Sequence, residues 1–182
     1  AAERWVAVLD ERYWIADNGG YAFTADDTPD VIVRMRSAHD DATPNANAIQ
    51  ISNLVALNLL TGRQAYLDRA RAIPDAFAPD LGRNALGHCG VLAGCFDLLA
   101  PQHVVVIAPG AAATAPLADA MFELSLPGAI QQVIGTDQPL TAPALAGKTA
   151  VDGKPTAYAC IGPQCSLPVT DPGALLELLR MQ

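Results

Sequence analysis

The sequence is poor in basic residues and has no long apolar run. Its 182 residues contain 11 lysines and arginines against 19 aspartates and glutamates, which gives a formal net charge of −8. A protein of this sign repels phosphate backbones and anionic lipid. No stretch approaches the roughly 20 apolar residues that a membrane-spanning helix needs, and the start lacks a basic region followed by an apolar one. We therefore expect neither a nucleic-acid nor a membrane partner.

Cysteine is also scarce, with four in the chain arranged as two close pairs. This density is more typical of a reducing compartment than of a secreted scaffold, so we expect a cytoplasmic protein. Cys89 and Cys95 point apart on a predicted helix and are interpreted as core residues. Cys160 and Cys165 flank a Gly-Pro pair and allow a disulfide, half of a metal site or two reduced thiols. Reduced thiols are the expected state, and a redox role would require an exposed thiol of low pKa.

What the chain does have is enough apolar content, 51%, to bury a sizeable core. Helical spacing of apolar residues predicts helices over residues 1–15, 44–60, 64–77 and 84–99. The second of these is apolar on most sides and is expected to be buried all round, while Pro74 should kink or shorten the third. Alternating buried and half-exposed helices are what stacked helical hairpins require.

The pattern changes after Pro101, where short β-rich runs alternate with helical segments. The predicted elements are strands over 103–108, 129–134 and 155–160 and helices over 114–124 and 172–181. These elements form a small α/β appendage, so we place the domain boundary between 1–101 and 102–182. The sequence starts at Ala1 without a methionine, and we expect it to be part of a longer gene product.

Four stretches carry a family resemblance when they are taken together. In chain order they are Asn-Gly-Gly-Tyr-Ala-Phe-Thr-Ala at 18–25, Asp-Asp-Ala-Thr-Pro-Asn-Ala-Asn at 40–47, Leu-Thr-Gly at 60–62 with Tyr66, and Ala-Tyr-Ala-Cys at 157–160 with Cys165. Their order and spacing resemble the thioredoxin-domain-containing proteins of the spermatogenesis-associated type, the bacterial YyaL-like family. Two positions depart from the family pattern, because Asp41 stands in place of a glycine and Asn45 in place of a serine.

The resemblance implies a mainly α fold. It implies a partial (α/α)6 toroid of helical hairpins with a small C-terminal α/β unit, similar to N-acylglucosamine 2-epimerases and six-hairpin glycosidases. A thioredoxin-like domain and the first part of the toroid would precede this chain. We therefore expect the apolar faces of residues 1–15 and 44–60 to be covered by the rest of the parent polypeptide or by a second copy.

The loop over residues 34–47 is the predicted site, because it concentrates polar groups ahead of a buried helix. Paired carboxylates serve general acid and base chemistry, and such groups also bind sugar hydroxyls. The predicted catalytic residues are Asp40 and Asp41, and the predicted substrate-binding residues are Arg34, Arg36, His39 and Asn47. Cys160 and Cys165 are a separate, redox candidate. We predict no cofactor and no metal site.

A structural interpretation of the same loop stands beside the functional one. The carboxylates can pair with Arg34 and Arg36, Asn45 or Thr43 can cap the next helix, and a buried Asn47 can bond backbone carbonyls. The first functional hypothesis is a carbohydrate-active or sugar-binding protein, its reaction unknown. The alternative is a non-catalytic scaffold or partner-binding region, so whether the chain is an enzyme stays open.

Overall fold

The chain divides into two compact units in the computed structural model, which describes residues 1–137 and 141–181, without the side chains of 111–113. The first unit comprises Ala1–Asn58 and Arg63–Leu98, and the second comprises Leu59–Gly62 and the chain from Leu99 onward. None of the helices in the described ranges combines the length and hydropathy needed to cross a bilayer.

The first unit is helical except for one long irregular segment. Its elements are α1 (Ala2–Arg12), α2 (Ala46–Thr61), α3 (Gln64–Arg83), the 3-10 turn η1 (Ala85–His88) and α4 (Cys89–Leu99). The four predicted helices are confirmed. The third is longer than expected, because α3 continues through Pro74 and Pro79 to Arg83. Between α1 and α2 the chain makes an isolated bridge from Trp14 to Tyr21 but no regular strand.

Helix α2 supplies much of the first core, although it is not buried all round. Ile51 and Leu54 are fully buried, whereas Ile49 is 48% exposed. Two polar residues of the same helix, Asn47 and Gln50, are buried although Ile49 is exposed. Close packing on this helix depends on Gly94 of α4, since a Cβ there would come 2.9 Å from the Cβ of Ile51.

The second unit is built on a four-stranded mixed sheet in the order β2-β1-β3-β4. Its elements are β1 (Gln102–Ala108), α5 (Ala111–Glu123), β2 (Ile130–Gly135), the 3-10 turn η2 (Pro143–Leu145), β3 (Thr156–Ile161), β4 (Gln164–Cys165) and α6 (Pro172–Arg180). Strand β1 pairs in parallel with β2 and antiparallel with β3. These positions confirm the strands and helices predicted after Pro101.

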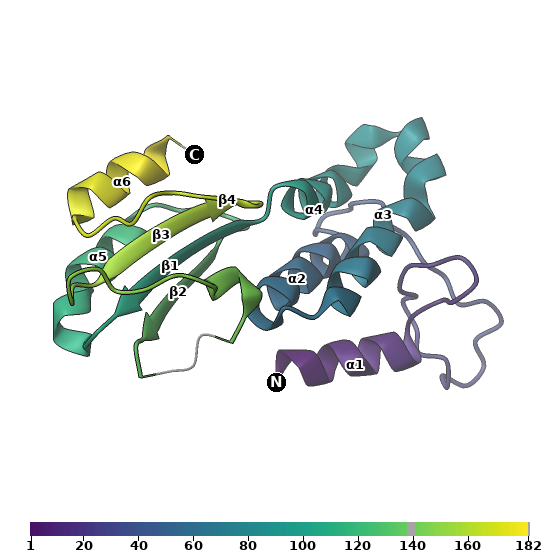
Figure 1. Cartoon of the computed structure of the whole chain (residues 1–182). Helices are drawn as coiled ribbons and strands as arrows, with labels where there is room; N and C mark the ends of the chain where they lie inside the picture. Colours follow the sequence, from purple (N-terminus) through teal and green to yellow (C-terminus); the bar gives the residue numbers. More distant parts are fainter. Residues whose placement is uncertain (138–140, 182) are drawn as a thin grey trace. The chain divides into compact units, whose positions relative to one another are not determined.

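Both faces of the sheet are covered, because side chains of β1 alternate between two cores. Val104 and Val106 face α5 and α6, which lie over one side of the sheet (Figure 1). Val105 and Ile107 lie on the opposite face with Tyr158 and the segment around η2. A strand buried on both faces explains why β1 is continuously apolar from Val104 to Ala108.

The prediction of a mainly α fold is wrong. The four-stranded sheet and its two cores make up the second unit, and the described chain is not a toroid of helical hairpins. The helical pattern of the first hundred residues favoured a mainly helical fold. The β runs after Pro101 instead pair into one sheet with a core on each face.

Candidate functional site

The two predicted arginines bond to backbone carbonyls. Arg34 donates from Nη2 to the carbonyl O of Arg12 at 2.7 Å and of Thr24 at 3.2 Å. Arg36 donates from Nη1 to the carbonyl O of Asn18 at 3.0 Å, and its guanidinium lies 4.8 Å from the ring centre of Phe77. Among the described ion pairs neither arginine meets Asp40 or Asp41. Both arginines therefore hold the irregular segment in place.

Asp40 bonds backbone amides on two sides. Its Oδ2 accepts from the backbone N–H of Gly90 at 2.6 Å and its Oδ1 from that of Asn45 at 3.1 Å. The carboxylate therefore ties the loop to the start of α4 and to the start of α2. Asp41 is exposed, and its Oδ1 accepts only from the adjacent Ala42 N–H at 3.0 Å among the described bonds.

Asn47 lies at the centre of this loop's network and is 1% exposed. Its Oδ1 accepts from the Tyr21 N–H at 2.7 Å, and its Nδ2 donates to the carbonyl O of Tyr21 and of Ser37, both at 3.0 Å. Asn45 caps α2 by accepting from the Asn47 N–H at 2.8 Å. Asn47 therefore bonds backbone groups and Asn45 caps α2, as the structural interpretation of the loop predicts.

A polar cavity of about 340 Å³ brings only two predicted site residues together, Arg36 and His39. The cavity also includes Asp80, Arg83 and His88. Nδ1 of buried His88 lies 2.7 Å from the Asn84 carbonyl O, so this nitrogen carries the proton. The His39 and His88 rings meet edge to face at 5.4 Å. Sequence reasoning assigned no role to His88, since its partners come from η1 and a distant loop.

An apolar cavity of about 420 Å³ in the same unit was not predicted. Its lining consists of Leu9, Tyr13, Tyr21, Ala22, Phe23, Ala46, Ile49 and Gln50. Gln50 is 6% exposed. Its Nε2 lies near the Tyr21 hydroxyl, yet it finds no partner in hydrogen-bond geometry among the described residues. The Tyr21 hydroxyl instead donates to Oδ1 of Asp10 at 2.5 Å, and burial followed by Asp10 raises the pKa of Tyr21.

A cavity of about 570 Å³ lies in the second unit at the carboxyl ends of β1 and β2. Pro109, Gly110, Thr114 and Asp137 are among its lining residues. The Thr114 hydroxyl is used internally, because it donates to the Gly110 carbonyl O at 2.6 Å. None of the described lining residues is basic, and Asp137 contributes a carboxylate.

Cys160 and Cys165 form a disulfide, so the expectation of two reduced thiols is wrong. They are direct cross-strand partners on β3 and β4. Cys89 and Cys95 do not bridge, as predicted, but the interpretation of both as core residues is wrong, because Cys89 is exposed and Cys95 is only half-buried. Within residues 1–137 and 141–181, no group of three or more His, Cys, Asp or Glu side chains is arranged to hold a metal ion.

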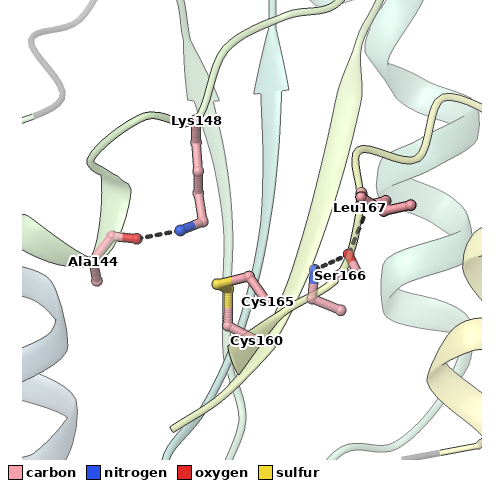
Figure 2. Close-up of a disulfide and its surroundings, with 7 residues drawn as sticks. Ala144, Lys148, Cys160, Cys165, Ser166 and Leu167 are labelled. Carbon is pink, nitrogen blue, oxygen red and sulfur yellow. Dashed lines mark hydrogen bonds between the residues drawn. A yellow bond between two sulfur atoms is a disulfide. The ribbon is translucent and has the colours of Figure 1, made fainter. Parts of the chain in front are cut away.

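Two buried basic residues lie on the sheet face that carries the disulfide. His103 is 3% exposed and is the cross-strand partner of Cys160. Lys148 is 8% exposed, donates to the Ala144 carbonyl O at 2.6 Å and extends toward the disulfide (Figure 2). Burial lowers the pKa of Lys148. Burial also lowers the pKa of His103, with Lys148 adding to this and the bond to Gln132 opposing it.

The second unit should lose stability in mild acid because His103 is folded in its neutral form. A histidine whose pKa is lower in the folded state binds fewer protons there, so stability falls as the pH drops through about 6.5, by at most about 1.4 kcal/mol per pH unit. Urea unfolding followed by circular dichroism at pH 7 and pH 5 would measure this loss. His103→Gln should remove most of it, and an unchanged pH dependence in that variant would contradict the assignment.

No family model matches the chain. It is 26% identical over 181 residues to spermatogenesis-associated protein 20 of Rattus norvegicus, covering 95% of this chain and 23% of that protein. It is 25% identical over 179 residues to the Homo sapiens protein of that name, covering 94% of this chain and 23% of that protein. The chain thus spans less than a quarter of the curated relatives that it matches. The similarity extends over nearly the whole chain and agrees with the family resemblance seen in its motifs.

Proposed function

We propose that the first unit of this chain is a non-catalytic scaffold that binds another polypeptide segment. The observation that carries the proposal is the state of the predicted catalytic carboxylate. Asp40 already accepts two backbone N–H bonds, at 2.6 and 3.1 Å, that join the loop to α2 and α4. A general acid or base must be free to exchange a proton with a substrate. Asp40 is better suited to fixing the loop, and Arg34, Arg36 and Asn47 serve the same end.

The first unit also exposes more apolar surface than an isolated folded unit needs. Large exposed side chains include Trp5 at 63%, Phe23 at 57%, Ile32 at 99%, Val33 at 67%, Met35 at 64% and Ile49 at 48%. Phe23 and Ile49 stand at the apolar cavity. Exposed apolar residues around a cavity are typical of an interaction site.

The proposed occupant is a segment of a longer parent polypeptide that inserts an apolar side chain. The relatives are more than four times as long as the matched region, which leaves ample sequence for such a segment. The segment would contact the apolar lining of the cavity, where Phe23 and Ile49 are exposed.

A sugar fits the apolar cavity less well. Its many hydroxyls would each need a partner, and burying a hydroxyl without one is costly. Gln50 supplies the one buried donor without a partner among the described lining residues, whereas the Tyr21 hydroxyl is bonded to Asp10. We further propose a C-terminal position in a parent protein of the thioredoxin-domain family and a cytoplasmic location, which rest on the motif ending at Cys165 and on the low cysteine content.

The test compares self-association of the 182-residue chain with that of a variant at the cavity. In the absence of its partner the wild type should associate and bind a fluorescent apolar dye. Phe23→Ser combined with Ile49→Ser should weaken both, as measured by sedimentation velocity and dye fluorescence. Leu86→Ser is the matched control, because Leu86 is 87% exposed but does not line the cavity.

Two results would refute the scaffold proposal. The first is a wild-type chain that stays monomeric and binds no dye. The second is saccharide binding that is lost in Asp40→Asn and retained in the Phe23→Ser and Ile49→Ser variant, since this would return the loop to a substrate-binding role.

A further inference from the structure

The disulfide of the second unit has one accessible and one buried cysteine. Cys165 is exposed on β4, the edge strand of the sheet, whereas Cys160 is 5% exposed on β3. A thiolate from outside can therefore approach the Cys165 sulfur, and Cys160 would be the sulfur that leaves. Directional attack of this kind requires unequal access to the two sulfurs.

The leaving sulfur would emerge on the sheet face that also carries Lys148. Lys148 has three N–H donors, one of which goes to the Ala144 carbonyl O, and its side chain extends toward the disulfide (Figure 2). Its Nζ lies 5.9 Å from the ring centre of Tyr158 on the same strand as Cys160. A nearby cation stabilises a thiolate, and a more stable thiolate leaves faster.

The hairpin that carries the disulfide is held by other bonds as well. The Ser166 N–H donates to the Ala159 carbonyl O at 2.8 Å, and the Ala159 N–H donates to Ser166 Oγ at 3.2 Å. Ser166 Oγ in turn donates to the Leu167 carbonyl O at 2.8 Å (Figure 2). The loop closed by the disulfide is also short, so its contribution to stability is small on chain-entropy grounds. We therefore expect the sheet to stay folded when the disulfide opens.

We propose that Cys160–Cys165 is a thiol–disulfide exchange centre whose substrate is a dithiol, with Cys165 as the attacked sulfur and Lys148 stabilising the Cys160 thiolate. One thiolate of the dithiol bonds to Cys165 Sγ as the Cys160–Cys165 bond breaks, and Cys160 takes up a proton. The second thiolate of the dithiol then attacks its own partner sulfur in the mixed disulfide and releases Cys165. The dithiol loses two electrons and two protons, and this chain's disulfide gains them.

This assignment goes beyond the scaffold function and is independent of the surface of the first unit. It also accounts for a disulfide in a chain whose low cysteine content suggests a reducing compartment. Disulfides that form in such compartments are usually transient and take part in catalysis or sensing.

The experiment follows exchange in the folded, oxidised 182-residue chain. Dithiothreitol is added, free thiols are alkylated at intervals, and peptide mass spectrometry locates them, with Cys89 and Cys95 as internal references. We expect reduction without loss of the circular dichroism signal. In a parallel reaction, reduced glutathione should be found on Cys165 while Cys160 is alkylated.

Lysine variants test the role of the charge. Lys148→Met should slow reduction by about tenfold, and Lys148→Arg should keep the rate within about twofold, because it retains the charge. Lys154→Met is the matched control, since Lys154 is exposed in the same unit, and its rate should equal that of the wild type. Melting curves show which variants are folded. Reduction that needs a denaturant, glutathione found mainly on Cys160, or a Lys148→Arg variant as slow as Lys148→Met would overturn the proposal.

Discussion

Replacing Asn47 with alanine should destabilise the first unit by about 3–5 kcal/mol. The loss has a specific cause, because three groups bonded to this side chain would lose their partner within a packed interior. They are the Tyr21 N–H, the Tyr21 carbonyl O and the Ser37 carbonyl O. Denaturant unfolding followed by tryptophan fluorescence is a suitable measurement, since both tryptophans, Trp5 and Trp14, lie in this unit.

Asn53→Ala provides the control on the same helix. Asn53 is exposed, and its Nδ2 bonds to Oε1 of Gln50 at 3.3 Å. Its removal should change the free energy of unfolding by no more than about 0.5 kcal/mol. Equal losses in the two variants would show that Asn47 is not the centre of a buried network.

Asp40→Asn should cost about 2–3 kcal/mol of stability in the first unit. The two carboxylate oxygens of Asp40 each accept from a backbone N–H, one of Gly90 and one of Asn45. An asparagine keeps one acceptor and turns the other position into a donor that faces a donor. The midpoint of denaturant unfolding should therefore fall, with the slope unchanged.

Asp41→Asn is the matched partner of this substitution. Asp41 is exposed and its side chain bonds only to the neighbouring Ala42 N–H among the described contacts, so we expect a change of about 0.5 kcal/mol or less. Equal free energies of unfolding for Asp40→Asn and Asp41→Asn would contradict the structural role given to Asp40.

The positions of most helices and strands could be predicted because they depend on local spacing of apolar residues. The run from Val104 to Ile107 is an example, since it is apolar at every position and lies in a strand buried on both faces. The arrangement of the strands could not be read in this way. His103 pairs with Cys160 far along the chain, and no local pattern encodes that register.

The candidate site was predicted less well, because side-chain types do not reveal backbone partners. Of the predicted loop residues, only Arg36 and His39 share a cavity. The acceptor for Arg34 is a carbonyl of Arg12 or Thr24, and the donor to Asp40 is an N–H of Gly90. Because nearly every residue carries a backbone N–H and a carbonyl, the sequence does not show which of them a side chain will bond. The sequence around Lys148 did not indicate that this lysine is buried either, since its burial depends on the fold around η2 and β3.

The central place of β1 has a consequence for synthesis of the chain on the ribosome. β1 is made before its antiparallel partner β3, Thr156–Ile161. Until β3 is made, one edge of a strand that is apolar from Val104 to Ala108 stays open, and an open apolar edge can pair with another nascent chain. Expression yield should therefore depend on translation rate and on chaperones that shield residues 102–108 during this interval.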